Sequence, residues 1–149
     1  MKVMKEIMNE KVKLDEITKK IIGCAYEVSN TLGSGFPESV YEKALHHQAL
    51  KTGLKAERQF QMKVHYDGVL VGEFFADLLI EGKVLVEIKA VRELDELHVA
   101  QAMNYLKASD LPICLLINFG RPKIEIRRFV PYDVWKENKH RITPHRVRS

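Results

Sequence analysis

Three charged residues stand out beside the apolar runs of the stretch from Gly72 to Lys89. Asp77 lies in its first half, and Glu87 and Lys89 lie near its end. An ionised group inside an apolar stretch is costly unless it is paired or holds a metal. Two carboxylates and a lysine could bind a divalent cation and support hydrolysis. The alternative is an inter-strand salt bridge between Lys89 and Asp77 or Glu87.

The apolar runs on either side of Glu81-Gly82 are short and rich in β-branched residues, which predicts two strands of a hairpin. Glu87 and Lys89 are two residues apart, so their side chains lie on the same face. A two-residue loop would pair Asp77 with Val86 and leave Asp77 on the opposite face from Glu87. A shared site therefore requires a three-residue or bulged turn.

If the two carboxylates do meet, a cation between them would relieve their repulsion. Ligands that are all oxygen favour Mg²⁺ or Mn²⁺ over zinc. The Lys89 ammonium would lie beside the attacking water and the substrate anion. It could orient the water and stabilise charge that develops on the phosphorus centre.

The elements that must position this hairpin follow from the periodicity of the chain. Apolar residues at helical spacing predict a helix over residues 15–32 and another from Pro37 towards Gly53. Strands are expected at residues 57–66, at residues 69–80 after an Asp67-Gly68 turn, at residues 112–119 and at residues 123–129. A helix capped by Asp95 connects the hairpin to the apolar strand 112–119, which predicts a parallel crossover.

Length and composition indicate one ordinary globular domain over residues 1–149, with peripheral segments at 1–14 and 136–149 and Trp135 as an anchor. The net charge of +4 is compatible with a nucleic-acid partner but not diagnostic of one. Cys24 and Cys114 are expected to be buried and not to form a zinc site. With no apolar span and no secretory signal, we expect a cytoplasmic protein without membrane contact.

Three motifs together resemble the PD-(D/E)XK nuclease superfamily. Asp77 followed ten residues later by Glu87-Ile88-Lys89 matches its central motif, with Ala76 where a proline often stands. The segment from Gln101 to Tyr105 resembles the QxxxY motif of RecB-like nucleases. The segment Gly35-Phe-Pro-Glu38-Ser-Val-Tyr41 is similar to the signature of GxxExxY proteins, a bacterial family assigned to the same superfamily. The resemblance covers about residues 17–129.

The resemblance implies a restriction-endonuclease-like α/β fold, in which a central mixed β-sheet is flanked by helices. It implies that Asp77 and Glu87 bind Mg²⁺ or Mn²⁺, with the Ile88 carbonyl and Glu38 near the metal, and that Lys89 serves catalysis. From its position alone, Glu38 could equally complement the macrodipole of its helix.

The resemblance further implies that Gln101, Tyr105 and Tyr41 contact the substrate. Gln101 and Tyr105 also share a helical face by their spacing. The expected function is metal-dependent hydrolysis of nucleic acid, DNA more than RNA. The alternatives are a non-catalytic nucleic-acid-binding module and a protein-interaction module with the same fold. A homodimer stays open, because many nucleases that act on duplexes pair up.

Overall fold

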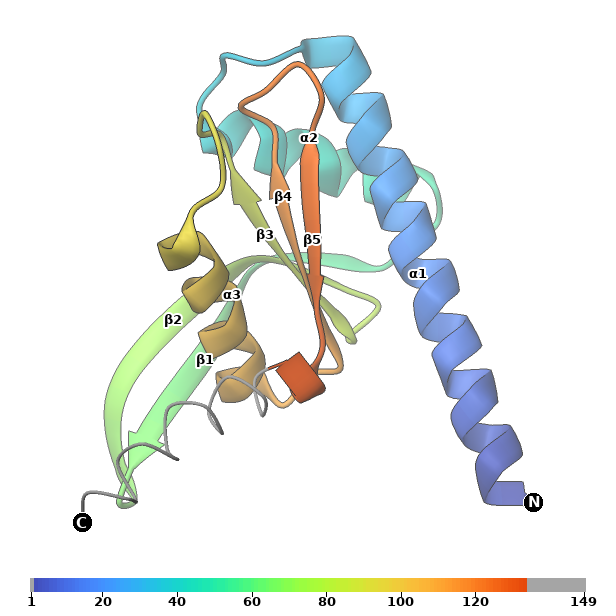
Figure 1. The fold of residues 1–149 in the computed structure, drawn as a ribbon, viewed down its shortest axis with the longest axis vertical. Coiled ribbons are helices and arrows are strands. Elements are labelled where there is room, and N and C mark those ends of the chain that lie inside the picture. The colour runs from blue at the N-terminus through green and yellow to red at the C-terminus, as the bar shows by residue number, and fades with distance from the viewer. Residues whose placement is uncertain (1, 134–149) are drawn as a thin grey trace.

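The computed structural model describes residues 2–133 and shows one five-stranded mixed sheet with helices on both faces (Figure 1). The strands are arranged in the order β1-β2-β3-β4-β5; β3 and β4 are parallel, and the other neighbours are antiparallel. This is the restriction-endonuclease-like architecture that the sequence predicted. The elements, in chain order, are α1 (Lys2–Leu32), α2 (Glu38–Lys51), β1 (Ala56–Tyr66), β2 (Val69–Ile80), β3 (Val84–Lys89), α3 (Glu96–Ser109), β4 (Ile113–Asn118) and β5 (Glu125–Phe129).

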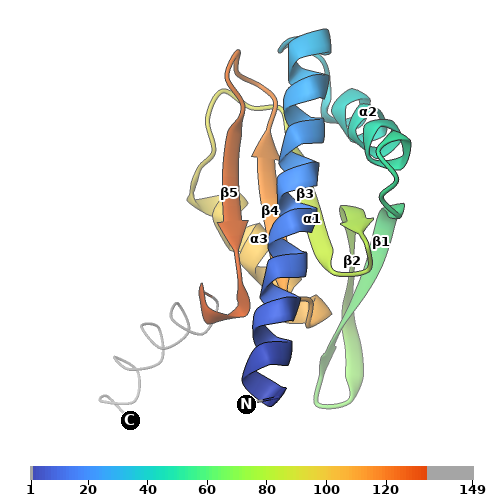
Figure 2. The same ribbon diagram turned by 90° about the vertical axis from the view of Figure 1, so that its right-hand side faces the viewer.

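Two apolar clusters hold the layers together. Val86 and Ile88 of β3 pack with α1 and α2 on one face, whereas Leu85 packs with α3 on the other. Figure 2 shows α1 running across one face of the sheet, with α3 behind the strands. Because β3 and β4 are covered on both faces, their sequences are apolar apart from Glu87, Lys89 and Asn118. An ionised side chain in β3 therefore stands out against its neighbours.

The turn between β2 and β3 has the length that a shared site requires. Ile80 pairs with Val84, so three residues, 81–83, form the loop. Glu81 and Gly82 both adopt positive φ angles, 53° and 65°. The same register pairs Leu78 with Val86. Extended by one residue, it places Asp77 opposite Glu87, as the three-residue alternative predicted.

The pairing of β2 with β3 ends at Leu78 and Val86, while β2 continues to pair with β1 as far as Val69. We call this place, at Asp77 and Glu87, the fork. Residues 60–76 of the β1–β2 hairpin form a two-stranded arm that projects beyond β3 (Figure 1).

The arm alters one expectation from the sequence. Phe74 and Phe75, interpreted as part of the apolar hairpin, remain 44% and 49% exposed. The short β3 does not extend along this part of β2, so no third strand lies beside it.

At the N-terminus, α1 begins at Lys2 and forms one continuous helix through the segment expected to be peripheral. Its first turns leave Val3, Ile7 and Val12 exposed, which explains their weak pattern in the sequence. Trp135 and the segment 136–149 lie outside the described residues. Within residues 2–133, no helix is both long and apolar enough to cross a membrane.

Candidate metal and nucleic-acid site

Asp77 and Glu87 face each other at the fork. Each carboxylate accepts a hydrogen bond from a backbone N–H where β2 and β3 diverge. Asp77 Oδ2 accepts the Ile88 N–H at 2.7 Å, and Glu87 Oε1 accepts the Asp77 N–H at 3.0 Å. Each carboxylate thus binds a backbone N–H where the ladder between β2 and β3 has stopped. These reciprocal bonds fix both carboxylates at one place.

Burial raises the pKa of both groups, because an ionised carboxylate is poorly solvated there. The pKa of Asp77 rises to about 7, and the nearby Glu42 carboxylate contributes to that rise. The pKa of Glu87 rises to about 8, with Asp77 as the second cause after burial. Glu87 is only 3% exposed. Two carboxylates that both resist ionisation form a site that a cation would stabilise.

Lys89 lies two residues beyond Glu87 and is half-buried. Its charge favours the ionised form of Glu87 and partly offsets the rise in the pKa of that group. Among residues 2–133, however, no ion pair joins Lys89 to Asp77 or Glu87. The inter-strand salt bridge that the sequence left open is not formed.

Helix α2 brings two further carboxylates towards the fork. Glu38 is exposed in its first turn, and its charge raises the pKa of both Asp77 and Glu87. Sequence reasoning missed Glu42, which is 6% exposed. Glu42 lies four residues after Glu38 and so shares its face of the helix, a signal that could have identified it.

The Glu42 carboxylate is held by two residues of β1. Its Oε2 accepts the Arg58 Nε and Nη2 hydrogens at 3.1 and 2.7 Å, and its Oε1 accepts the Gln59 amide at 2.6 Å. Gln59 adopts a left-handed backbone with φ of 55°, which is uncommon for a residue other than glycine. This local departure from strand geometry occurs where Gln59 of β1 contacts Glu42 of α2. No sequence pattern predicted this contact.

Tyr41 is fully buried, so the substrate contact expected for it is not available in this structure. Its side chain has no exposed area and stacks on Phe119 with ring centroids 4.8 Å apart. Its hydroxyl donates to the Gly33 carbonyl at 2.6 Å and accepts the Phe36 N–H at 3.1 Å. Tyr41 therefore secures the α1–α2 connection. The residue three positions from Glu38 has a structural role.

On the opposite face of the sheet, α3 brings Gln101 and Tyr105 together as their spacing predicted. The Gln101 amide donates to the Tyr105 hydroxyl at 3.0 Å. Burial raises the pKa of Tyr105, and the charges of Glu87 and Asp77 raise it further. Tyr105 thus lies within electrostatic reach of the fork.

Asn118 at the end of β4 is a second polar residue that sequence reasoning did not single out. It is fully buried and binds both backbone groups of Val91, the Gly120 N–H and the Glu125 carboxylate. A polar residue at the end of an apolar strand was the available signal. Because Asn118 is the register partner of Lys89, it fixes the chain that leaves β3.

The donor set fits a hard divalent cation. Among the described residues, no three His, Cys, Asp or Glu side chains cluster closely enough to hold a metal by themselves. Mg²⁺, however, keeps several waters and is commonly bound through one or two carboxylates. Asp77 and Glu87 each accept one backbone N–H, which leaves lone pairs for a cation. The Ile88 N–H points at Asp77. In a β-strand the carbonyl of a residue points to the same side as its N–H, so the Ile88 carbonyl also faces β2.

Comparison with known proteins points to one superfamily. The family model described as PD-(D/E)XK nuclease superfamily matches residues 15–129. A solved structure titled "Crystal structure of SSO0001" is similar with a TM-score of 0.51 at 19% sequence identity. The similarity covers 81% of this chain and 61% of that one, and at this identity it shows a shared fold alone. A comparison with curated proteins gave no match.

Proposed function

Because the chain belongs to the PD-(D/E)XK nuclease superfamily, we propose that it hydrolyses phosphodiester bonds of nucleic acid with the help of Mg²⁺ or Mn²⁺. The observation that carries this proposal is the convergence of the half-buried Asp77 and the buried Glu87 at the fork. Among residues 2–133, no ion pair joins Lys89 to either carboxylate. The GxxExxY signature at residues 35–41 supports a finer assignment to that family, and DNA is the proposed substrate.

The roles of the residues follow from their positions. Asp77, Glu87 and the Ile88 carbonyl would hold the cation, with Glu38 near its waters. Such a cation polarises the phosphate oxygens and lowers the pKa of water. Asp77 and Glu87 would keep the fork anionic once their protons are displaced. Gln101 and Tyr105 on α3 would contact the strand next to the scissile bond.

Lys89 supplies the positive charge on the protein side of this site. It lies on the same face of β3 as Glu87, and its charge acts on that carboxylate. Its ammonium can orient the attacking water and stabilise the additional negative charge of the transition state. Removing it should lower the rate more than it weakens cation binding.

The decisive experiment is cleavage of single-stranded, duplex and flapped substrates with Mg²⁺ or Mn²⁺. We expect cleavage by the wild type that EDTA stops and that Asp77→Asn, Glu87→Gln and Lys89→Ala each reduce by about 10²-fold or more. Matched controls are Asp67→Asn at the tip of the arm and Lys55→Ala, both exposed. Binding without metal-dependent cleavage would instead support the non-catalytic alternative.

A further inference from the structure

A pocket of about 720 Å³ lies between α3 and the arm, beside the fork. This volume is in the range of ligand sites. One stripe of α3 forms one wall, with Leu97, Gln101 and Asn104 at helical spacing. Residues 63–65 of β1 and Phe74 of β2 form the other wall. The part of the chain that makes this pocket contains the Gln101–Tyr105 pair already placed near the carboxylates.

The lining of this pocket suits a polyanion. Lys107 contributes a basic side chain, and Gln101 and Asn104 contribute amides, whereas no carboxylate lines it. Lys63 and His65 border the pocket from β1. A second pocket lies along another stripe of α3, and its charged lining residues are Asp95, Glu96 and Arg127. Carboxylates therefore line the second pocket but not the one that faces the arm.

An aromatic ring stands in the wall of the pocket. Phe74 is 44% exposed, and its ring lies 6.1 Å from that of Tyr105 at an interplanar angle of 46°. Tyr105 is itself 8% exposed and lies within electrostatic reach of Glu87 and Asp77. Phe74 is thus a partly exposed ring that lies near a second ring, Tyr105. Such a ring is a surface on which a base can stack.

We propose that this pocket binds an unpaired segment of the nucleic-acid strand, with a base stacked on Phe74 and an adjoining phosphate near Lys107. The inference rests on the proposed function and names its substrate class, a strand with an unpaired stretch beside the scissile bond. Only an unpaired strand exposes the face of a base to an aromatic ring, because a duplex buries those faces in its own stack. The amides of Gln101 and Asn104 can bind the edges of such a base or its sugar.

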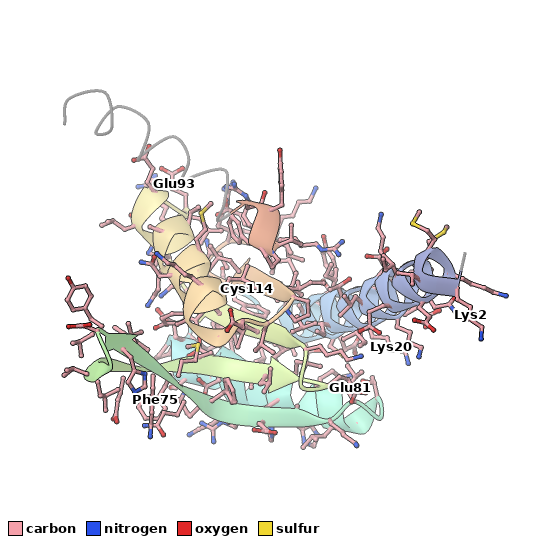
Figure 3. All side chains as sticks on the ribbon, turned by 90° about the horizontal axis from the view of Figure 1, so that it is seen from below. Lys2, Lys20, Phe75, Glu81, Glu93 and Cys114 are labelled. Carbon is pink, nitrogen blue, oxygen red and sulfur yellow. The ribbon has the colours of Figure 1, made fainter. Side chains whose placement is uncertain are left out.

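The neighbouring Phe75 offers a matched control. It is the same residue type, with a similar exposed fraction of 49%, but does not line the pocket. Consecutive side chains of a strand point to opposite faces, and Figure 3 shows Phe75 on the side of the arm away from α3. Replacing either ring removes a similar amount of exposed apolar surface.

The test is fluorescence anisotropy with a labelled single-stranded oligonucleotide and with a duplex of the same sequence, both in EDTA so that no cleavage occurs. We expect the wild type to bind the single strand more tightly. Phe74→Ala should weaken that binding by about tenfold or more, and Phe75→Ala should leave it unchanged. Lys107→Ala should lower the slope of log affinity against log salt by about 0.7, the value for one phosphate contact on a single strand.

Equal loss in Phe74→Ala and Phe75→Ala, or preferential binding of the duplex, would overturn the proposal. A labelled RNA strand distinguishes DNA from RNA within the same binding mode. Because the measurement needs no metal, its failure is separable from failure of the proposed hydrolysis. If the wild type cleaves nucleic acid but Phe74→Ala binds the single strand as tightly as the wild type does, the pocket assignment alone is refuted. Loss of binding in Phe74→Ala without any wild-type cleavage would refute the nuclease assignment alone.

Discussion

The carboxyl groups of Asp77 and Glu87 should make the stability of the metal-free protein depend on pH. Their pKa values in the fold, about 7 and about 8, are above those of the unfolded chain, near 4. Between about pH 4 and pH 8 the folded state therefore binds more protons than the unfolded state. The free energy of unfolding must then fall as the pH rises through this window, and level off above it.

Urea denaturation in EDTA from pH 5 to pH 8.5 checks this expectation. Glu87→Gln keeps an acceptor for the Asp77 N–H but cannot ionise, so its stability should fall less steeply than that of the wild type. The exposed Asp67→Asn should keep the wild-type slope. A wild-type profile that is flat or that rises over this range would contradict the burial of the two carboxyls.

Tyr41→Phe separates a structural tyrosine from a substrate-binding one. The variant keeps the stacking on Phe119 but loses the hydroxyl bonds to Gly33 and Phe36. We expect the free energy of unfolding to fall by about 1–2 kcal/mol, with the cleavage rate per folded molecule unchanged. Loss of cleavage at unchanged stability, measured by urea denaturation and a rate assay, would restore the substrate role.

At the level of secondary structure, Asn118 joins the end of β4 to the chain that follows β3. Asn118→Ala leaves the backbone N–H and carbonyl of the half-buried Val91 without their side-chain partners. We expect a loss of about 1–3 kcal/mol in the free energy of unfolding and slower cleavage, because Lys89 is its register partner. The exposed Asn30→Ala should stay within about 0.5 kcal/mol of the wild type. Equal stability of the two variants would contradict this role.

The elements themselves were predictable where local chemistry and periodicity agree. Asp95 caps α3 with a hydrogen bond from the His98 N–H, as its position before the helical stripe indicated. The three-residue turn at 81–83 was left as one of two alternatives, because the loop length decides the register but the dipeptide Glu81-Gly82 fits both. The exposure of Phe74 depends on where β3 stops pairing with β2, and that is a tertiary feature.

At the level of the whole molecule, the sequence predicted which residues meet but not what surrounds them. Asp77, Glu87 and Lys89 could be chosen because charge in an apolar hairpin is unusual. Glu42 shares a helix face with Glu38, but the sequence does not reveal its contacts with Arg58 and Gln59 of a distant strand. The pocket between α3 and the arm likewise combines distant segments of the chain, and the net charge of +4 does not indicate its position.

The central claim is that the fork binds a hard divalent cation in place of protons. Titration calorimetry with Mn²⁺ at pH 7, in two buffers of different ionisation enthalpy, tests it most directly. We predict one Mn²⁺ per chain with release of protons, because both carboxyls are partly protonated at this pH without metal. Asp77→Asn and Glu87→Gln should abolish the binding, and Asp67→Asn should not. Absence of binding in the wild type, or binding that survives both substitutions, would contradict the account.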